Sequence, residues 1–335
     1  MYNPPFATVL RPYGRALVEL AGRREDVLCL SGDLTRQCEV DLFEERFPER
    51  FVNGGMAEAN IVGMAGALAR QGFQPYVHTF GVFATRRCYD QVAMAVAYPN
   101  LPVRLVGFMP GISSPGGPSH QAIDDVALMR ALPNMSVLDV ADAVEAEQVV
   151  TVLSELPGPA YLRLKRGEVP VIFEPAHQLI RGRAQVLLEG SDAAIISSGM
   201  AVAIALSAAQ SLRQAGVSAS VTSVSTLKPL DSATIVHVAG GAAAGVTVEN
   251  HSIVGGLGSA VAEVLAEAGA AVPLRRVGIQ DTFAEGARTA NFLFRKYGLS
   301  TRAVVRAVWE VLGRPGAAPE VSPVDTIRPG TYSPV

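Results

Sequence analysis

The sequence predicts an α/β fold made of two parallel-sheet units. Short runs of β-branched and other apolar residues alternate with longer Ala-rich stretches, which is the pattern of parallel strands joined by crossover helices. The strand runs are uniformly apolar rather than alternating, as in sheets covered by helices on both faces. The 335 residues leave room for about two such units.

The expected strands, in chain order, cover residues 27–30, 75–78, 103–108, 160–164, 193–197, 219–224, 245–249 and 274–278. The expected helices lie between them, at residues 58–71, 85–97, 144–156, 202–215 and 258–268. Residues 167–190 interrupt the alternation, because they contain Pro170 and Pro175 and have no sustained periodicity.

The interruption divides the chain into domains. We expect a first unit at residues 1–175, a linker at 176–190 and a second unit at 191–312. The last stretch, 313–335, is rich in Pro and Gly. It predicts an extended tail that is ordered only where it docks on a neighbour.

Composition narrows the function classes. The net charge of −3 gives no general electrostatic case for nucleic acid. Charged residues make up 18% of the chain, below the roughly 25% of an average soluble domain, which indicates surface covered by another chain. Cys29, Cys38 and Cys88 have no CxxC spacing and indicate neither a disulfide framework nor a zinc site. With no secretory signal or spanning segment apparent, we expect a cytoplasmic location.

Glu58 is the first candidate for chemistry. It follows Gly54 and Gly55 at the start of a predicted helix, where the helix dipole alone would favour a carboxylate. The small residues of that helix also allow another backbone to approach closely. A glutamate covered in this way would lose water, its pKa would rise, and it could act as an acid near neutral pH. Both interpretations stay open.

Two loops after predicted strands carry the next candidates. Phe80 and Phe83 are either core packing or a shelf on which a flat heterocycle stacks. His120 lies in the loop GISSPGGPSHQAIDD, where α/β sheets bind ligands, just before a helix expected near Gln121. It is either a ligand-binding group or a helix cap.

A basic cluster leaves the strand at 160–164. Arg163, Lys165 and Arg166 are either a solvated edge or a phosphate clamp, and Arg11 could join them in space. The sequence has no GxxxxGK[ST], no GxGxxG that opens a helix after a strand, and no HExxH.

These segments, taken in order, resemble the C-terminal half of transketolase, and more specifically the small subunit of a split transketolase. The resemblance runs from about residue 8 to residue 312. It is carried by LSGDL, NGGMAEANIVGMAGALA, VHTFGVFATRRCYDQV, GGPSHQA, TLKPLD and VTVENHSIVGGLGSAVAEVLAE. It implies a thiamine-diphosphate pyrimidine-binding domain and a transketolase C-terminal domain.

The resemblance also implies roles for single residues. Glu58 corresponds to the glutamate that hydrogen-bonds N1′ of the aminopyrimidine and thereby activates the cofactor. Phe80 and Phe83 correspond to the aminopyrimidine pocket, and Asp33 to an acid near the cofactor. His120 corresponds to a histidine that contacts substrate oxygens and assists proton transfer. Further substrate contacts are implied by matches at Arg166, Arg11 and His78.

The sequence departs from the family pattern near the substrate. Ser114-Pro115-Gly116-Gly117 replaces a stretch that usually carries an acid before the histidine. A further family histidine falls at Phe108 or Met109. His78 stands where a small Ser is usual, and Arg86 where an aromatic or small residue is frequent. These departures predict retained cofactor chemistry with an unusual donor or acceptor.

The other half of such a site is missing from this sequence. The family binds the diphosphate and Mg²⁺ through GDG followed by Asn, and Gly32-Asp33 is followed here by Leu34. We therefore expect a large subunit that carries this motif, in an α2β2 heterotetramer. The expected activity is transfer of a two-carbon ketol unit from a ketose to an aldose acceptor. We expect the ketose to be phosphorylated. The alternatives are the β subunit of a 2-oxo acid dehydrogenase or acyloin-forming enzyme, and a non-catalytic regulatory subunit of the same fold.

Overall fold

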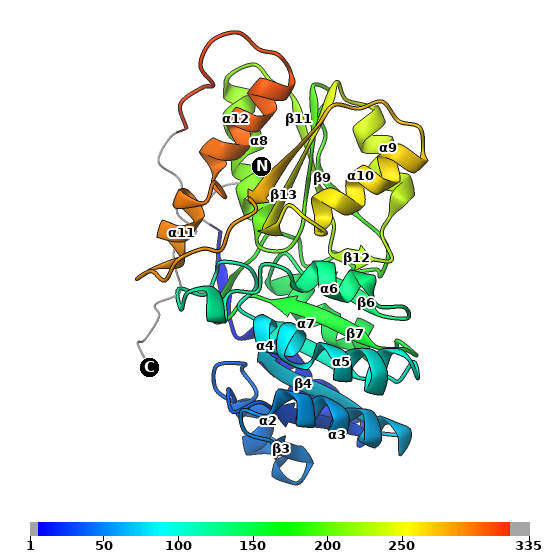
Figure 1. The fold of residues 1–335 in the computed structure, drawn as a ribbon. Helices are drawn as coiled ribbons and strands as arrows, with labels where there is room; N and C mark the ends of the chain where they lie inside the picture. The colour runs from blue at the N-terminus through cyan, green and yellow to red at the C-terminus, as the bar shows by residue number, and fades with distance from the viewer. Residues whose placement is uncertain (1–5, 322–335) are drawn as a thin grey trace.

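The computed structural model describes residues 6–321, and they form two α/β units stacked one above the other (Figure 1). The first unit is built on a seven-stranded sheet and the second on a five-stranded sheet. The predicted fold class, with parallel strands dominating both sheets, is confirmed. No helix of the described residues is long and apolar enough to cross a bilayer.

The seven-stranded sheet is parallel except at one edge. Its order is β12 (Thr226–Lys228), β6 (Ser136–Asp139), β7 (Ala160–Leu164), β5 (Arg104–Phe108), β4 (Gln74–Phe80), β2 (Val27–Ser31) and β3 (Phe51–Asn53). Strand β12 comes from the second unit and pairs antiparallel with β6. The second unit therefore contributes a strand to the sheet of the first.

Helices cover both faces of this sheet. One face packs on α1 (Pro12–Arg23) and α7 (Ala143–Ser154), through residues such as Leu17 and Val149. The other packs on α3 (Glu58–Arg70) and α6 (Asp125–Ala131). The remaining elements of this unit are α2 (Asp41–Arg46), α4 (Gly81–Thr85), α5 (Tyr89–Gln91), the short helical turns η1 (Pro48–Arg50), η2 (Arg86–Cys88) and η4 (Pro118–His120), and the π-helical η3 (Val92–Ala97).

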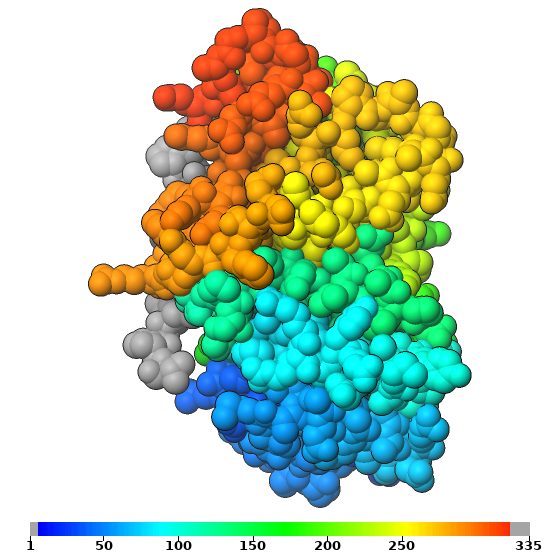
Figure 2. All heavy atoms as spheres, viewed as in Figure 1, coloured from blue at the N-terminus to red at the C-terminus, as the bar shows by residue number. Residues whose placement is uncertain are grey.

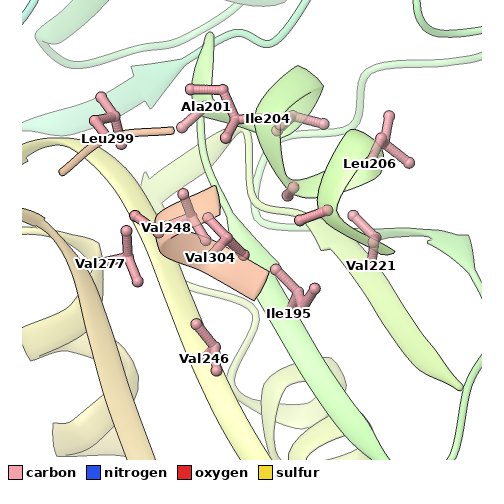
Figure 3. Packing of buried hydrophobic residues seen from close by; sticks show 14 of the residues in the cluster. Ile195, Ala201, Ile204, Leu206, Val221, Val246, Val248, Val277, Leu299 and Val304 are labelled. Atoms are coloured by element: carbon pink, nitrogen blue, oxygen red, sulfur yellow. The ribbon is translucent and has the colours of Figure 1, made fainter. Parts of the chain in front are cut away.

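The five-stranded sheet has the order β14 (Leu274–Ile279), β13 (Ala244–Ser252), β10 (Ala193–Ser197), β11 (Ala219–Ser223) and β9 (Gln185–Leu188). Its core, drawn in Figure 3, packs sheet residues such as Ile195 and Val248 against Ile204 and Val304 of the flanking helices. Those helices are α8 (Ala201–Gln214) and α12 (Thr301–Val311). The other helices of this unit are α9 (Ser232–Gly240), α10 (Leu257–Glu267) and α11 (Ala290–Lys296).

The connection between the units is more regular than expected. A two-stranded ribbon of β1 (Thr8–Leu10) and β8 (Glu168–Pro170) ties the start of the chain to the end of the first unit. Strand β9 lies inside the predicted linker and pairs antiparallel with β11, so the second sheet begins before residue 191. Of the predicted tail, residues 313–321 are described and 322–335 lie outside the described residues.

A buried ionic cluster joins the two units. Arg163, with 1% of its side chain exposed, lies within 2.8 Å of both Asp125 and Asp139. It also donates a hydrogen bond to the backbone oxygen of Asn250 in β13. Burial lowers the pKa of Arg163, but the two carboxylates outweigh it and the net pKa is raised. Arg163 is thus a charged anchor between the sheets and does not form part of an exposed basic edge.

Candidate active site

The candidate residues follow the carboxyl ends of neighbouring parallel strands. Asp33 follows β2, Glu58 follows β3, Phe83 follows β4, His120 follows β5 and Arg166 follows β7. Because these strands are adjacent in the sheet and parallel, the loops after them lie along one edge. The sequence prediction of loops at this edge agrees with the observed topology.

Glu58 is a buried carboxylate with one cationic partner. It is the first residue of α3 and only 2% exposed. Nη1 of Arg87 lies 3.0 Å from its Oε1 and 2.9 Å from its Oε2, so the guanidinium bonds both oxygens. A carboxylate removed from water is costly unless it is paired, and Arg87 provides the pairing.

The space between Glu58, Gly32 and Thr79 is narrow and contains an unpaired hydroxyl group. A Cβ added to Gly32 would lie 3.5 Å from Cγ of Glu58 and 3.3 Å from Oγ1 of Thr79. Thr79 is 1% exposed, and its Oγ1 has no hydrogen-bond partner. Buried polar atoms in folded proteins are nearly always satisfied, so an unpaired hydroxyl beside a buried carboxylate indicates a place for a polar ligand.

Three rings form an aromatic group next to this carboxylate. Phe80 and Phe83 are stacked, with ring centroids 6.1 Å apart and planes 17° apart. The His120 ring stands edge-on to Phe83 at 5.3 Å and to Phe80 at 6.5 Å. The structure therefore brings together Phe80 at the end of β4, Phe83 in α4 and His120 in η4, and offers a flat apolar surface bordered by a titratable ring.

The helical segment after β4 is interrupted, and the interruption exposes two arginine side chains. The predicted helix at 85–97 is wrong as one continuous element: α4 starts at Gly81, and η2, α5 and η3 follow it with changed hydrogen bonding. Thr85 Oγ1 donates to the carbonyl of Gly81, a local bond that bends helices. The break leaves Arg86 and Arg87 exposed while Phe83 stays half-buried.

The His120 loop is anchored on the second unit. Nε2 of Gln121 donates to the backbone oxygens of Ser114 and Glu285, and the amide of Ala287 donates to Pro115. In Figure 2 the green atoms of this loop meet the orange atoms of the second unit. The helix expected near Gln121 begins instead at Asp125, because Pro118–His120 forms a separate 3-10 turn. Both units thus fix the position of His120.

The backbone of Arg11 lies next to the segment that carries Arg166. The amide of Arg11 donates to the carbonyl of Gly167, directly after Arg166. The guanidinium of Arg11 pairs with Asp41. Glu39, buried beneath, accepts hydrogen bonds from the amides of Gly14 and Gly167, and burial raises its pKa. Arg11 therefore has an internal counter-ion.

His78 does not fit a role as a substrate ligand. Its side chain is fully buried, with Nδ1 3.2 Å from the carbonyl of Leu30 and Nε2 2.8 Å from the hydroxyl of Tyr13. Burial lowers its pKa to about 4, so the ring is neutral near pH 7. The physical reason is its place in the interior strand β4, between β5 and β2, where it fills the core. Asp33 differs: it is exposed, in a left-handed backbone conformation with φ 63°.

Sequence reasoning missed Arg87 and Thr79. Arg87 follows Arg86 directly, and the pair gives no signal of which one faces Glu58. A lone Thr in an apolar strand reads as β-propensity alone. Within residues 6–321, no group of three or more His, Cys, Asp or Glu residues could hold a metal ion.

Comparison with known proteins decides the family. Residues 8–171 match the transketolase pyrimidine-binding domain, and residues 182–304 match the transketolase C-terminal domain. The chain belongs to the transketolase family. It is 39% identical over 93% of its length to a 6-deoxy-6-sulfo-D-fructose transketolase subunit of Clostridium sp. strain MSTE9, and covers 98% of that protein. It is 37% identical over 89% of its length to a putative transketolase C-terminal section of Methanocaldococcus jannaschii, and covers 94% of it.

Structural and more distant matches agree with this assignment. A split gene transketolase described as an inactive β4 tetramer superimposes with a TM-score of 0.84 at 42% identity, over 90% of this chain and 97% of that one. The 1-deoxy-D-xylulose-5-phosphate synthase of Thermomicrobium roseum is 36% identical over 87% of this chain, which covers 47% of that enzyme. Transketolase-family enzymes depend on thiamine diphosphate, and this chain is a subunit of that type.

The residues present fit the aminopyrimidine half of that cofactor. Glu58 offers a buried carboxylate to a ring nitrogen, Phe83 a face for stacking, and Thr79 an unpaired hydroxyl for a polar edge. An aminopyrimidine is a flat ring with donors and acceptors on its rim, and these three residues supply an acceptor, an apolar face and a hydroxyl that complement it.

Proposed function

We propose that the chain is the small subunit of a split, thiamine-diphosphate-dependent transketolase. It transfers a two-carbon ketol unit from a ketose to an aldose acceptor. A separate large subunit with a GDG…Asn motif completes the site, holds the diphosphate and Mg²⁺, and pairs with this chain as α2β2. The observation that supports this best is the buried Glu58 beside Phe83 and His120, each in the segment that the family resemblance marks.

The roles of the residues follow from their surroundings. Thiamine diphosphate, when bound, supplies a nucleophilic carbon and an electron sink for cleaving the bond next to a carbonyl. Glu58 holds a proton between its carboxylate and the pyrimidine nitrogen. Phe80 and Phe83 orient the ring and exclude water. His120, whose Nδ1 is 2.9 Å from the Ser119 hydroxyl, presents its other nitrogen to substrate oxygens.

The residues proposed to bind the substrate lie farther along the same edge of the sheet. In this proposal Arg166, beside the backbone of Arg11, binds an anionic group of the substrate, and the exposed Asp33 lies near the cofactor. Ser114 and Gly116 occupy the segment where the family has an acid, which favours a donor or acceptor other than the ordinary pentose phosphates. The relative named for 6-deoxy-6-sulfo-D-fructose is consistent with such variation in substrate.

The test is ketol transfer by the complex isolated from the native cells. With hydroxypyruvate as donor and glycolaldehyde as acceptor, we expect formation of a new ketose that requires this chain. The carboxylate of hydroxypyruvate leaves as CO₂ in this reaction, so CO₂ by itself does not separate the alternatives. Release of CO₂ from a 2-oxo acid without a ketol group, such as pyruvate, with transfer of an acyl group would instead identify a 2-oxo acid dehydrogenase-type subunit. Full activity of the partner in the absence of this chain would indicate a regulatory role.

A further inference from the structure

Arg87 uses the same two features of the pocket that the aminopyrimidine would use. Its Nη1 bonds both carboxylate oxygens of Glu58, and its Cζ lies 4.1 Å from the centroid of the Phe83 ring. The planar guanidinium of Arg87 thus bonds the Glu58 carboxylate and at the same time stacks on the face of the Phe83 ring. Such stacking is a recognised mode of guanidinium binding.

We propose that Arg87 closes the aminopyrimidine position in the free subunit, and that its guanidinium must leave Glu58 and Phe83 before the cofactor can bind there. This inference rests on the proposed function. The Glu58 carboxylate is at hydrogen-bond distance from Arg87 on both oxygens, so a ring nitrogen cannot take the same approach while Arg87 stays.

The two partners differ in their freedom to move. Glu58 is 2% exposed at the first turn of α3, whereas the Arg87 side chain is 45% exposed in the turn η2. The exchange therefore moves Arg87 and leaves Glu58 in place. Because an unpaired buried carboxylate is costly, release of Arg87 is favourable only when another donor arrives. The pair keeps the free subunit stable and makes cofactor binding depend on displacement.

The neighbouring arginine is a matched control. Arg86 has the same chemistry and an adjacent position, but its Nε lies 3.1 Å from Asp124 and its Nη2 donates to the carbonyl of Gln121. Neither of these two contacts of Arg86 involves Glu58 or Phe83. Removing its charge changes the local field without opening the proposed position.

The experiment measures binding of 4-amino-5-hydroxymethyl-2-methylpyrimidine, the pyrimidine half of thiamine, to the isolated full-length chain by NMR titration. Arg87→Gln should raise the affinity at least about tenfold, because apparent affinity scales with the fraction of open molecules. Arg87→Lys should give a smaller gain, since a lysine pairs with Glu58 at a single point. Arg86→Gln should bind like the wild type, and adding Glu58→Gln to Arg87→Gln should abolish the gain.

Two results would overturn the inference, and they differ in what else they remove. If Arg87→Gln and Arg87→Lys bind the pyrimidine no better than the wild type, while Glu58→Gln weakens binding, Arg87 does not close the site but the proposed function stands. If binding is independent of Glu58 in every variant, the aminopyrimidine pocket itself is misplaced and the proposed function fails with the inference. The Lys variant keeps the test valid if the Gln variant does not fold.

Discussion

The imidazole of His120 stands edge-on to the ring of Phe83, with 5.3 Å between the ring centroids and 75° between the planes. His120 lies in the turn η4, which follows β5, and Phe83 lies in α4, which follows β4. Their contact places a titratable group beside the surface proposed for the aminopyrimidine. Edge-to-face pairs are favourable, so the contact also fixes the orientation of the imidazole.

Replacing the Glu58 carboxylate should separate chemistry from assembly. In the native complex, Glu58→Gln should lower turnover at least about a hundredfold, in the range of general acid–base contributions, because an amide cannot exchange a proton with the pyrimidine. Recovery of the complex should not change. The measurement is ketol transfer alongside size-exclusion chromatography, and Glu19→Gln on the exposed face of α1 is the control. Full activity of the Glu58→Gln complex would disprove the catalytic assignment.

His120 should affect turnover more than cofactor affinity. His120→Asn keeps a polar side chain of similar width but removes proton transfer, and should lower kcat about a hundredfold. The affinity for thiamine diphosphate, measured by fluorescence quenching in the complex, should stay within about twofold of the wild type, because Glu58 and Phe83 are unchanged. His237→Asn, on the exposed side of α9, should alter neither value. An unchanged kcat for His120→Asn would show that the ring has only a packing role.

The buried ionic cluster of Arg163 should contribute several kcal/mol to the free energy of unfolding. Arg163→Met leaves Asp125 and Asp139 buried without their cation, which costs about 3 to 5 kcal/mol for a broken buried pair. Urea unfolding followed by circular dichroism measures the loss. Arg213→Met removes an exposed arginine and should change the unfolding free energy by less than about 0.5 kcal/mol. Equal stability of the two variants would contradict the role of this cluster in joining the units.

Acid should destabilise the protein through His78. The unfolded chain takes up a proton near pH 6.5, whereas burial holds the pKa of the folded-state ring at about 4. The unfolded state therefore binds protons more readily between these values, and stability falls as the pH drops. From pH 7 to pH 5 this group alone should cost about 2 kcal/mol. His78→Gln should remove that part of the pH dependence, measured as unfolding free energy at the two pH values, and an unchanged slope would refute it.

Prediction from sequence succeeded where a residue's position depends on local pattern. The buried parallel strands are continuous apolar runs, so β10 and β7 have the predicted bounds and the other expected strands shift by a few residues. The rule that ligands bind at loops after parallel strands marked the His120 loop, whereas Glu58 and Phe83 were joined to it only by the family resemblance.

It failed where individual side-chain contacts decide the structure. The helix predicted at 85–97 breaks because Thr85 bonds back to Gly81, and periodicity does not register such a bond. The pairing of Glu58 with Arg87 rather than Arg86 depends on the direction of that break. The resemblance implies a substrate contact for His78, whereas the structure places this side chain of β4 in the core, fully buried.

The most direct test of the account is the composition of the complex as it exists in the native cells. The chain is isolated under native conditions by an affinity tag, and the eluate is analysed by mass spectrometry for partner chains and for thiamine diphosphate. The account predicts a second chain with a GDG…Asn motif in equal amount, together with bound cofactor. Recovery of the chain alone, or with unrelated proteins and no thiamine diphosphate, would contradict it.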